Sequence, residues 1–231
     1  MARKDRAPTP PRKVQAPQRR STPSAPPDPA RRRNLLLGLA GAAVLLLAIV
    51  GGVLAFGGEG KSEAAVLEEA GCTLEVFPAD ADSSNHVEMD AEPDWNSFPP
   101  SNGPHYQVPA VLGFYEDPVP LIQSTHNLEH GTIVIHYGPD VPEAEIQSLR
   151  DWYTDDPNGI LVAPLEELED EIALAAWTTP DSAPGGEGTQ RGRGYLAKCP
   201  GFDRTAFDRF VSEHRFKGPE RIPPEHLTPG T

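Results

Sequence analysis

The chain has 231 residues and a formal net charge of −14 at pH 7. The charge is divided unevenly, because residues 1–33 hold ten basic and two acidic residues, a net charge of +8, while the rest of the chain carries −22. A domain of that acidity repels nucleic-acid phosphates, which excludes a nucleic-acid partner. The opposite signs of the two parts indicate a membrane between them.

Residues 1–33 contain eight prolines and hardly any aliphatic side chains. A segment of this composition cannot bury enough apolar surface to form a core, so we expect a disordered basic tail. Its positive charge suits the anionic cytoplasmic leaflet of a membrane. The tail is therefore expected to be cytoplasmic.

The stretch Leu35–Phe56 is 22 residues long and has no charged or polar side chain. A helix of that length spans roughly 33 Å, which matches a hydrocarbon core of about 30 Å and predicts one transmembrane helix over 34–56. Because the cluster Arg31–Arg33 precedes it, we expect a single-pass protein of the cell membrane with a cytoplasmic N-terminus and an extracytoplasmic C-terminal part. A cleaved signal peptide is the alternative, but its apolar region is shorter, about 7–15 residues.

Residues 57–70 are expected to be a linker with a short helix across Glu63–Glu69, and residues 71–231 a single extracytoplasmic domain. A length of about 160 residues is enough for one domain with its own core. Both segments follow the predicted membrane helix.

Short β-rich runs alternate with two helical patterns in this domain. Pro142, followed by acids and by apolar residues at three-to-four spacing, predicts one helix, and Asp203 is a typical N-cap of a last helix that ends near Gly218. Residues 178–194 are rich in glycine and proline and predict a long loop. The order indicates an α+β fold class: one transmembrane helix followed by a single small mixed α/β domain. Strands are expected at Thr73–Phe77, Thr132–Tyr137, Ile160–Ala163 and Ile172–Trp177.

The two cysteines of the chain, Cys72 and Cys199, both lie in the domain that we expect to be exported. In an oxidising compartment an even pair at long separation predicts one disulfide. A loop of this length contributes on the order of 4–5 kcal/mol to stability. Two unpaired buried thiols are the alternative.

Five of the seven histidines fall between residues 86 and 136. Imidazole is the commonest protein ligand of zinc and copper, and two or three imidazoles with a carboxylate form an ordinary coordination shell. The sequence therefore predicts a transition-metal site for copper or zinc. The candidate ligands are His86, His105, His126, Glu129 and His130.

Three of these residues, His126, Glu129 and His130, form the spacing H-x-x-E-H. On a helix this spacing puts both imidazoles on one face, and it is also the pattern of inverted zincin metalloproteases, in which the glutamate acts as base. That motif belongs inside a long helix, whereas here Gly131 and a β-branched strand follow at once. We therefore expect a short helical turn that leads into a strand.

The segment Phe98–Tyr106 presents another candidate ligand, His105. Its prolines and the Asn102-Gly103 pair fix a tight turn, so the histidine is expected on a stiff loop. A structural turn whose histidine hydrogen-bonds locally is the alternative.

Three runs of the sequence resemble the bacterial family known as domain of unknown function 3105: PPSNGPHY (99–106), Gly113–Tyr115 and HNLEHGTIVIHY (126–137). The resemblance covers roughly residues 71–221. It implies a short basic tail, one membrane helix and an exported domain, with an early histidine at His86, a P-P-x-S/N-G-x-H-Y turn and an H-x-L-E-H-G motif before a strand. The resemblance implies where a functional site lies in the sequence, but it does not imply which reaction the protein catalyses.

Two features depart from the family pattern. His136 lies where the pattern is permissive, so it is not expected to be a ligand. The glycine-rich segment that holds Arg191, Arg193 and Cys199 resembles an insertion, which would make the disulfide special to this relative.

Three functions remain open from the sequence. The first is a membrane-anchored extracytoplasmic protein that binds copper or zinc through the histidine cluster. The second is a non-catalytic cell-envelope interaction module, whose protein partner the sequence does not identify, with the histidines in a structural network. The third is a zinc hydrolase. Ligands of a metal would converge on one point, whereas each histidine of a network would face a partner of its own.

Overall fold

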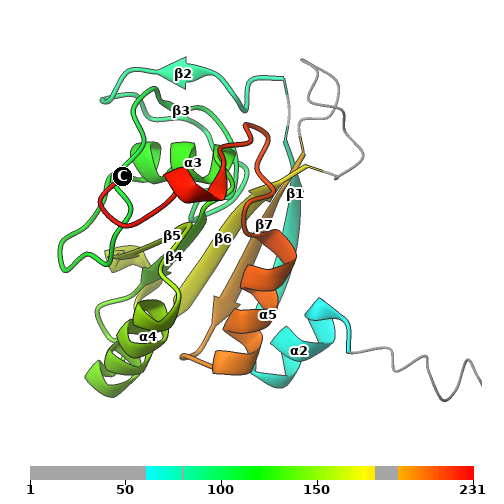
Figure 1. Ribbon diagram of the computed structural model, residues 1–231, viewed down its shortest axis with the longest axis vertical. Helices are drawn as coiled ribbons and strands as arrows, with labels where there is room; N and C mark the ends of the chain where they lie inside the picture. The colour runs from blue at the N-terminus through cyan, green and yellow to red at the C-terminus, as the bar shows by residue number, and fades with distance from the viewer. Residues whose placement is uncertain (1–60, 80, 180–191) are drawn as a thin grey trace, which may run out of the picture. The chain divides into compact units, whose positions relative to one another are not determined.

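A five-stranded sheet is the centre of the described chain, which the computed structural model gives as residues 61–79, 81–179 and 192–231. β4 and β5 are parallel, and the other neighbouring pairs are antiparallel (Figure 1). A parallel pair needs a crossover, which helix α4 (Glu143–Asp155) provides. In spatial order the strands are β1 (Thr73–Pro78), β7 (Arg193–Cys199), β6 (Ile172–Thr178), β4 (Ile133–Tyr137) and β5 (Ile160–Pro164).

Both faces of the sheet are covered. Apolar side chains of α2 (Glu63–Glu69), α4 and α5 (Arg204–His214) pack on one face, and those of α3 (Leu121–Glu129) and its neighbouring loops pack on the other. Figure 1 shows α4 and α5 lying side by side over the sheet. Every residue of β4 is buried because this strand is covered on both sides. The remaining elements are the small ribbon of β2 (His86–Val87) and β3 (His105–Tyr106) and the 3₁₀ turns η1 (Glu166–Leu168) and η2 (Pro224–His226).

The face under α2, α4 and α5 is apolar. Leu67 of α2 and the phenylalanines Phe207 and Phe210 of α5 are completely buried there. The disulfide between Cys72 and Cys199 belongs to the same cluster and joins β1 to β7. The predicted disulfide is therefore confirmed.

Most of the expected elements are confirmed. All four predicted strands are present, and the helix after Pro142 is α4. Asp203 is the N-cap of α5, since its Oδ1 accepts a hydrogen bond from the Ala206 backbone N–H at 2.9 Å. The helix ends at His214 rather than near Gly218, because the chain turns there to pack against the end of α3.

The prediction of a loop up to residue 194 is wrong at its end. Arg193–Cys199 forms β7, which lies between β1 and β6, so Cys199 is part of the sheet rather than of an inserted loop. Its glycine and lysine break the apolar alternation by which strands are recognised. Residues 180–191 lie outside the described residues.

The predicted membrane location is contradicted. Within the described ranges no helix is long and apolar enough to cross a membrane. The longest helix there, α4, has 13 residues, against about 20 for a span. The predicted span, 34–56, and the predicted tail, 1–33, lie outside the described residues. The fold class is therefore corrected from a membrane helix plus domain to a mixed α/β fold with four α-helices and a five-stranded sheet among the described residues.

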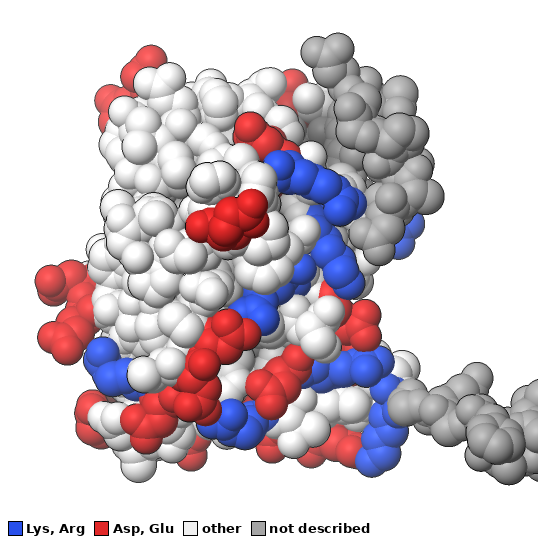
Figure 2. Space-filling view, viewed as in Figure 1, with Lys and Arg blue, Asp and Glu red and all other residues white. Residues whose placement is uncertain are grey.

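The surface over α4 and α5 carries both signs of charge. Figure 2 shows acidic and basic side chains interspersed there. Some of them are paired: Arg204 contacts Asp155 at 3.0 Å, and Arg215 contacts Asp156 at 2.7 Å. Exposed pairs of this kind contribute little, about 0–1 kcal/mol each. The stability of this face therefore comes from the apolar side chains beneath it.

Candidate metal site

The β2–β3 ribbon brings two of the candidate histidines side by side. His86 and His105 are direct partners in the parallel pairing of the two strands, and the backbone N–H of His105 donates to the Asn85 carbonyl at 3.1 Å. Their ring centroids are 5.2 Å apart. His86 is exposed, whereas His105 is completely buried. The ribbon therefore places one imidazole at the rim and one at the bottom of the same space.

The loop before His105 is held by buried hydrogen bonds. The Ser97 and Ser101 hydroxyls lie 2.9 Å apart, and the Ser101 backbone N–H donates to Ser97 Oγ at 2.9 Å. Gly103 has a φ of +127°, and a Cβ there would lie 2.5 Å from Trp95 Cδ1. Only glycine fits this close approach. The position of His105 is thus fixed by the loop on which the sequence analysis placed it.

Helix α3 supplies His126 and Glu129, and its C-cap is His130. Gly131 ends the helix with a φ of +85°, the left-handed conformation common after a helix C-terminus. The side chain of Asn127 is hydrogen-bonded on both sides to the backbone of Ala110, at 3.0 and 2.8 Å. These bonds attach the segment after β3 to the helix that carries the histidines.

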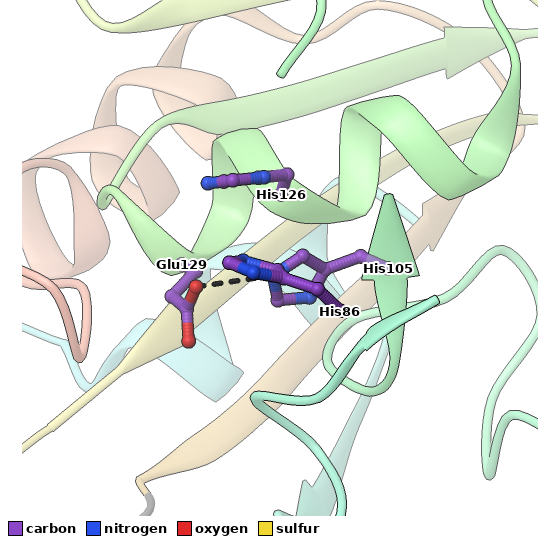
Figure 3. Close-up of side chains that lie close together, drawn as sticks. All are labelled: His86, His105, His126 and Glu129. Carbon is purple, nitrogen blue, oxygen red and sulfur yellow. Dashed lines mark ion pairs between the residues drawn. The ribbon is translucent and has the colours of Figure 1, made fainter. Parts of the chain in front are cut away.

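Four side chains meet between the ribbon and α3, and we call them the inner group. Each offers one ligand atom, and these atoms all lie within 4.8 Å of one another. Figure 3 shows the rings of His86 and His105 beside the Glu129 carboxylate, with the ring of His126 above them. Two donors that each bind an ion at about 2.1 Å lie at most roughly 4.2 Å apart, so small side-chain movements close the set around one ion. The inner group is His86, His105, His126 and Glu129.

Backbone carbonyls fix the orientation of two of these imidazoles. His105 Nδ1 lies 2.8 Å from the Gly103 carbonyl oxygen, and His126 Nδ1 lies 2.7 Å from that of Tyr106. Because a carbonyl oxygen only accepts, Nδ1 must carry the proton in both rings. In the neutral ring the lone pair is then on Nε2, which is the atom left to bind an ion. This is the arrangement that metal-binding histidines usually adopt.

The contact between His105 and Glu129 is close but incomplete. His105 Nε2 lies 3.1 Å from Glu129 Oε2, yet this buried nitrogen makes no hydrogen bond with any of the described residues. In the neutral ring with its proton on Nδ1, a nitrogen lone pair and a carboxylate oxygen would face each other, and both are acceptors. A second proton on Nε2 would instead make the contact an ion pair.

The protonation states of the titratable side chains at the end of α3 suit metal binding. Burial lowers the pKa of His126 and of His130, so both are neutral at pH 7. Burial acts to raise the pKa of Glu129, but its polar interactions with His105, Ser84 and His126 outweigh burial and hold that pKa below its ordinary value. Neutral imidazoles and an ionised carboxylate are the forms that bind metal ions.

A second set, which we call the outer group, consists of His126, His130 and Glu220, with ligand atoms again within 4.8 Å of one another. His130 Nε2 lies 3.1 Å from His126 Nε2 and 3.4 Å from Glu220 Oε2. The side chain of Glu220 is 58% exposed and that of His130 is 16% exposed. The structure therefore places His130 beside His126 in the outer group, and not in the inner group with His86, His105 and Glu129.

Glu220 was not predicted as a candidate ligand from the sequence. Its backbone N–H donates to the Glu129 carbonyl at 3.0 Å, and the Phe216 N–H donates to the Gly131 carbonyl at 2.7 Å. These bonds bring the segment after α5 against the end of α3. An acidic residue ninety positions after His130 carries no local signal, so only the tertiary fold identifies it.

His136 is separate from both groups. It lies on β4, where 1% of the residue is exposed, and neither ring nitrogen has a hydrogen-bond partner among the described residues. Burial lowers the pKa of His136 to about 4, so it is neutral at pH 7. It is not a member of either candidate ligand set.

Comparison with known families finds one family that matches the chain. The family described as protein of unknown function DUF3105 matches residues 86–226, more than half of the chain. The chain belongs to this family. The match contains every residue of the inner and outer groups. No curated protein and no solved structure matches the chain.

Proposed function

We propose that this DUF3105 domain binds one transition-metal ion, copper or zinc, through the inner group. One observation carries the proposal: Nδ1 of His105 and of His126 each contacts a backbone carbonyl oxygen, which leaves Nε2 as the ligand atom of both rings, and the ligand atoms of the inner group lie within 4.8 Å of one another. Imidazole nitrogen and carboxylate oxygen are ligands that both metals accept. His86 completes the set from the rim.

Energetic reasoning supports a cation in this space. Burying acceptor atoms without a donor costs on the order of 1–3 kcal/mol per group. The buried His105 Nε2 and the Glu129 carboxylate, 3.1 Å apart, incur that cost together unless a positive charge lies between them. A proton shared by the pair is the competing explanation, and it corresponds to the structural network considered from the sequence.

The geometry favours binding over hydrolysis. Four protein ligands fill a tetrahedral shell, whereas catalytic zinc sites keep one position open for water. Glu129, the residue that would act as base in an H-x-x-E-H protease, contacts His105 and belongs to the ligand set instead. The arrangement therefore resembles a holding site more than a hydrolytic one.

The test is a metal titration of the full-length chain, followed by calorimetry and by elemental analysis after dialysis. We expect one copper or zinc ion per chain, and at least a 100-fold loss of affinity in His105→Ala, the size of effect that ligand-shell changes produce. His86→Ala is a second variant, at an exposed position where folding is not at risk. His226→Ala removes an exposed histidine outside both groups and is the matched control.

The structural network gives the opposite results. In that case the wild-type chain would bind no ion, and His105→Ala would lower the free energy of unfolding in metal-free buffer. Because His105 is completely buried, His105→Ala lowers the stability of the metal-free chain under both explanations. The metal content of the wild-type chain, and the loss of affinity in the exposed variant His86→Ala, therefore decide between them.

A further inference from the structure

The inner and outer groups share one residue, His126, and this residue can serve only one group at a time. Its Nδ1 proton is donated to the Tyr106 carbonyl at 2.7 Å, so a single lone pair, on Nε2, remains for an ion. Both groups include His126, so each of them depends on that one atom. An ion held by the inner group therefore deprives the outer group of its buried ligand, and the reverse is also true.

The two groups differ in depth. Beside His126, the inner group has the buried residues His105 and Glu129, whereas the outer group has the partly exposed His130 and the exposed Glu220. The outer contacts of 3.1 and 3.4 Å are close to the separation of about 3.3 Å between two ligand atoms of a tetrahedral ion. Both sets thus have plausible ligand spacing, but only one is open to solvent.

From this arrangement we propose that the outer group is the entry and exit site of the metal. An ion first binds to Glu220 and His130 at the surface, is next bound by His126 Nε2, and then exchanges the two outer ligands for His105, Glu129 and His86. Release follows the same path in reverse. No step changes the oxidation state of the ion, and each ligand exchange leaves at least the His126 bond in place. This inference rests on the proposed function of the inner group.

A transfer site has a kinetic signature that an equilibrium ligand lacks. A residue that binds the ion on its way to the inner group, but not in the final bound state, accelerates loading and release by the same factor. Its removal therefore slows both rates and leaves the dissociation constant unchanged. A charge that merely attracts the ion would raise the loading rate alone, and its effect would weaken with salt. The two rates, measured separately, distinguish these roles.

The experiment is stopped-flow loading and release of Zn²⁺ or Cu²⁺, with a chromogenic chelator as donor and then as acceptor, on the full-length chain. For Glu220→Gln we expect both rates to fall about tenfold, within the range by which local charge alters rates, and the dissociation constant to stay within about threefold. Glu225→Gln removes the same charge at an exposed position outside both groups and is the control. His130→Gln should slow both rates as well.

Three results would contradict the proposal that the outer group is the entry site. The first is unchanged loading and release rates in Glu220→Gln, and the second is a larger dissociation constant in that variant caused by slower loading alone. The third is a second ion bound to the wild type at equilibrium. A wild-type chain that binds no ion would overturn the proposed function and the entry site together. If the chain binds an ion at the inner group but shows any of those three results, the entry site is rejected and the inner site is retained.

Discussion

Under α2, α4 and α5 the sheet buries hydrocarbon, a disulfide and the His214–Glu63 pair, whereas under α3 it buries a second apolar cluster together with histidine, asparagine, serine and a glutamate. Polar groups cost free energy when they leave water, unless every donor and acceptor is paired. On the α3 side His105 Nε2 and both ring nitrogens of His136 make no hydrogen bond with the described residues, and on the other side the same is true of His214 Nδ1. We infer that the apolar packing under α2, α4 and α5 stabilises the fold enough for the α3 side to bury ligand atoms without a hydrogen-bond partner.

The largest expected effect on the apolar face is the loss of its disulfide. Cys72 and Cys199 are 127 residues apart in sequence, and a loop of that length constrains the unfolded chain by about 5 kcal/mol. The double variant Cys72→Ala, Cys199→Ala should lose that much free energy of unfolding in urea titrations, and its metal affinity below the transition should match the wild type. A large loss of metal affinity in the folded double variant would show that the metal site on the α3 side depends on the disulfide on the opposite side of the sheet.

Next in size is the pH dependence caused by His136. Burial lowers its pKa to about 4, whereas an unfolded histidine titrates near 6.5. Between these values the unfolded chain binds a proton that the folded chain does not, so the free energy of unfolding falls as the pH drops from about 7 to about 4. The gap corresponds to about 3 kcal/mol.

The variant His136→Leu measures this contribution, because leucine cannot titrate and fits the apolar surroundings. Its stability relative to wild type should rise by about 3 kcal/mol between pH 7 and pH 4. Other titrating groups are common to both proteins and cancel in the difference. A difference that stays constant with pH would mean that His136 has a polar partner in solution.

The smallest expected effect on stability concerns Gly103, but it should be clear in metal binding. Alanine at a φ of +127° is strained, and its Cβ would lie 2.5 Å from Trp95 Cδ1. We expect Gly103→Ala to lower the free energy of unfolding by about 1–2 kcal/mol. It should also weaken metal affinity, because the loop fixes His105. If stability falls and affinity does not, the loop does not position the ligand.

The sequence predicted what local patterns encode. The strands around Ile133 and Ile172 and the helix after Pro142 follow from β-branched runs and from three-to-four spacing. The H-x-x-E-H motif was expected on a short helix before a strand, and α3 is nine residues long. The disulfide followed from there being just two cysteines.

The rest depended on tertiary contacts. β7 contains a glycine and a lysine, and its strand conformation comes from pairing with β1 and β6 on either side. The division of the histidines into two groups depends on Glu220, which reaches His130 through backbone hydrogen bonds to the end of α3. The spacing of residues along the sequence does not predict a contact between residues as far apart as His130 and Glu220.

The most direct test of the metal site is anomalous diffraction from crystals of the full-length chain loaded with zinc or copper, recorded at the absorption edge of that metal. The account predicts one strong peak between His86, His105, His126 and Glu129, within about 2.0–2.2 Å of their ligand atoms. A peak only at Glu220 and His130, a peak elsewhere, or none at full loading would contradict it.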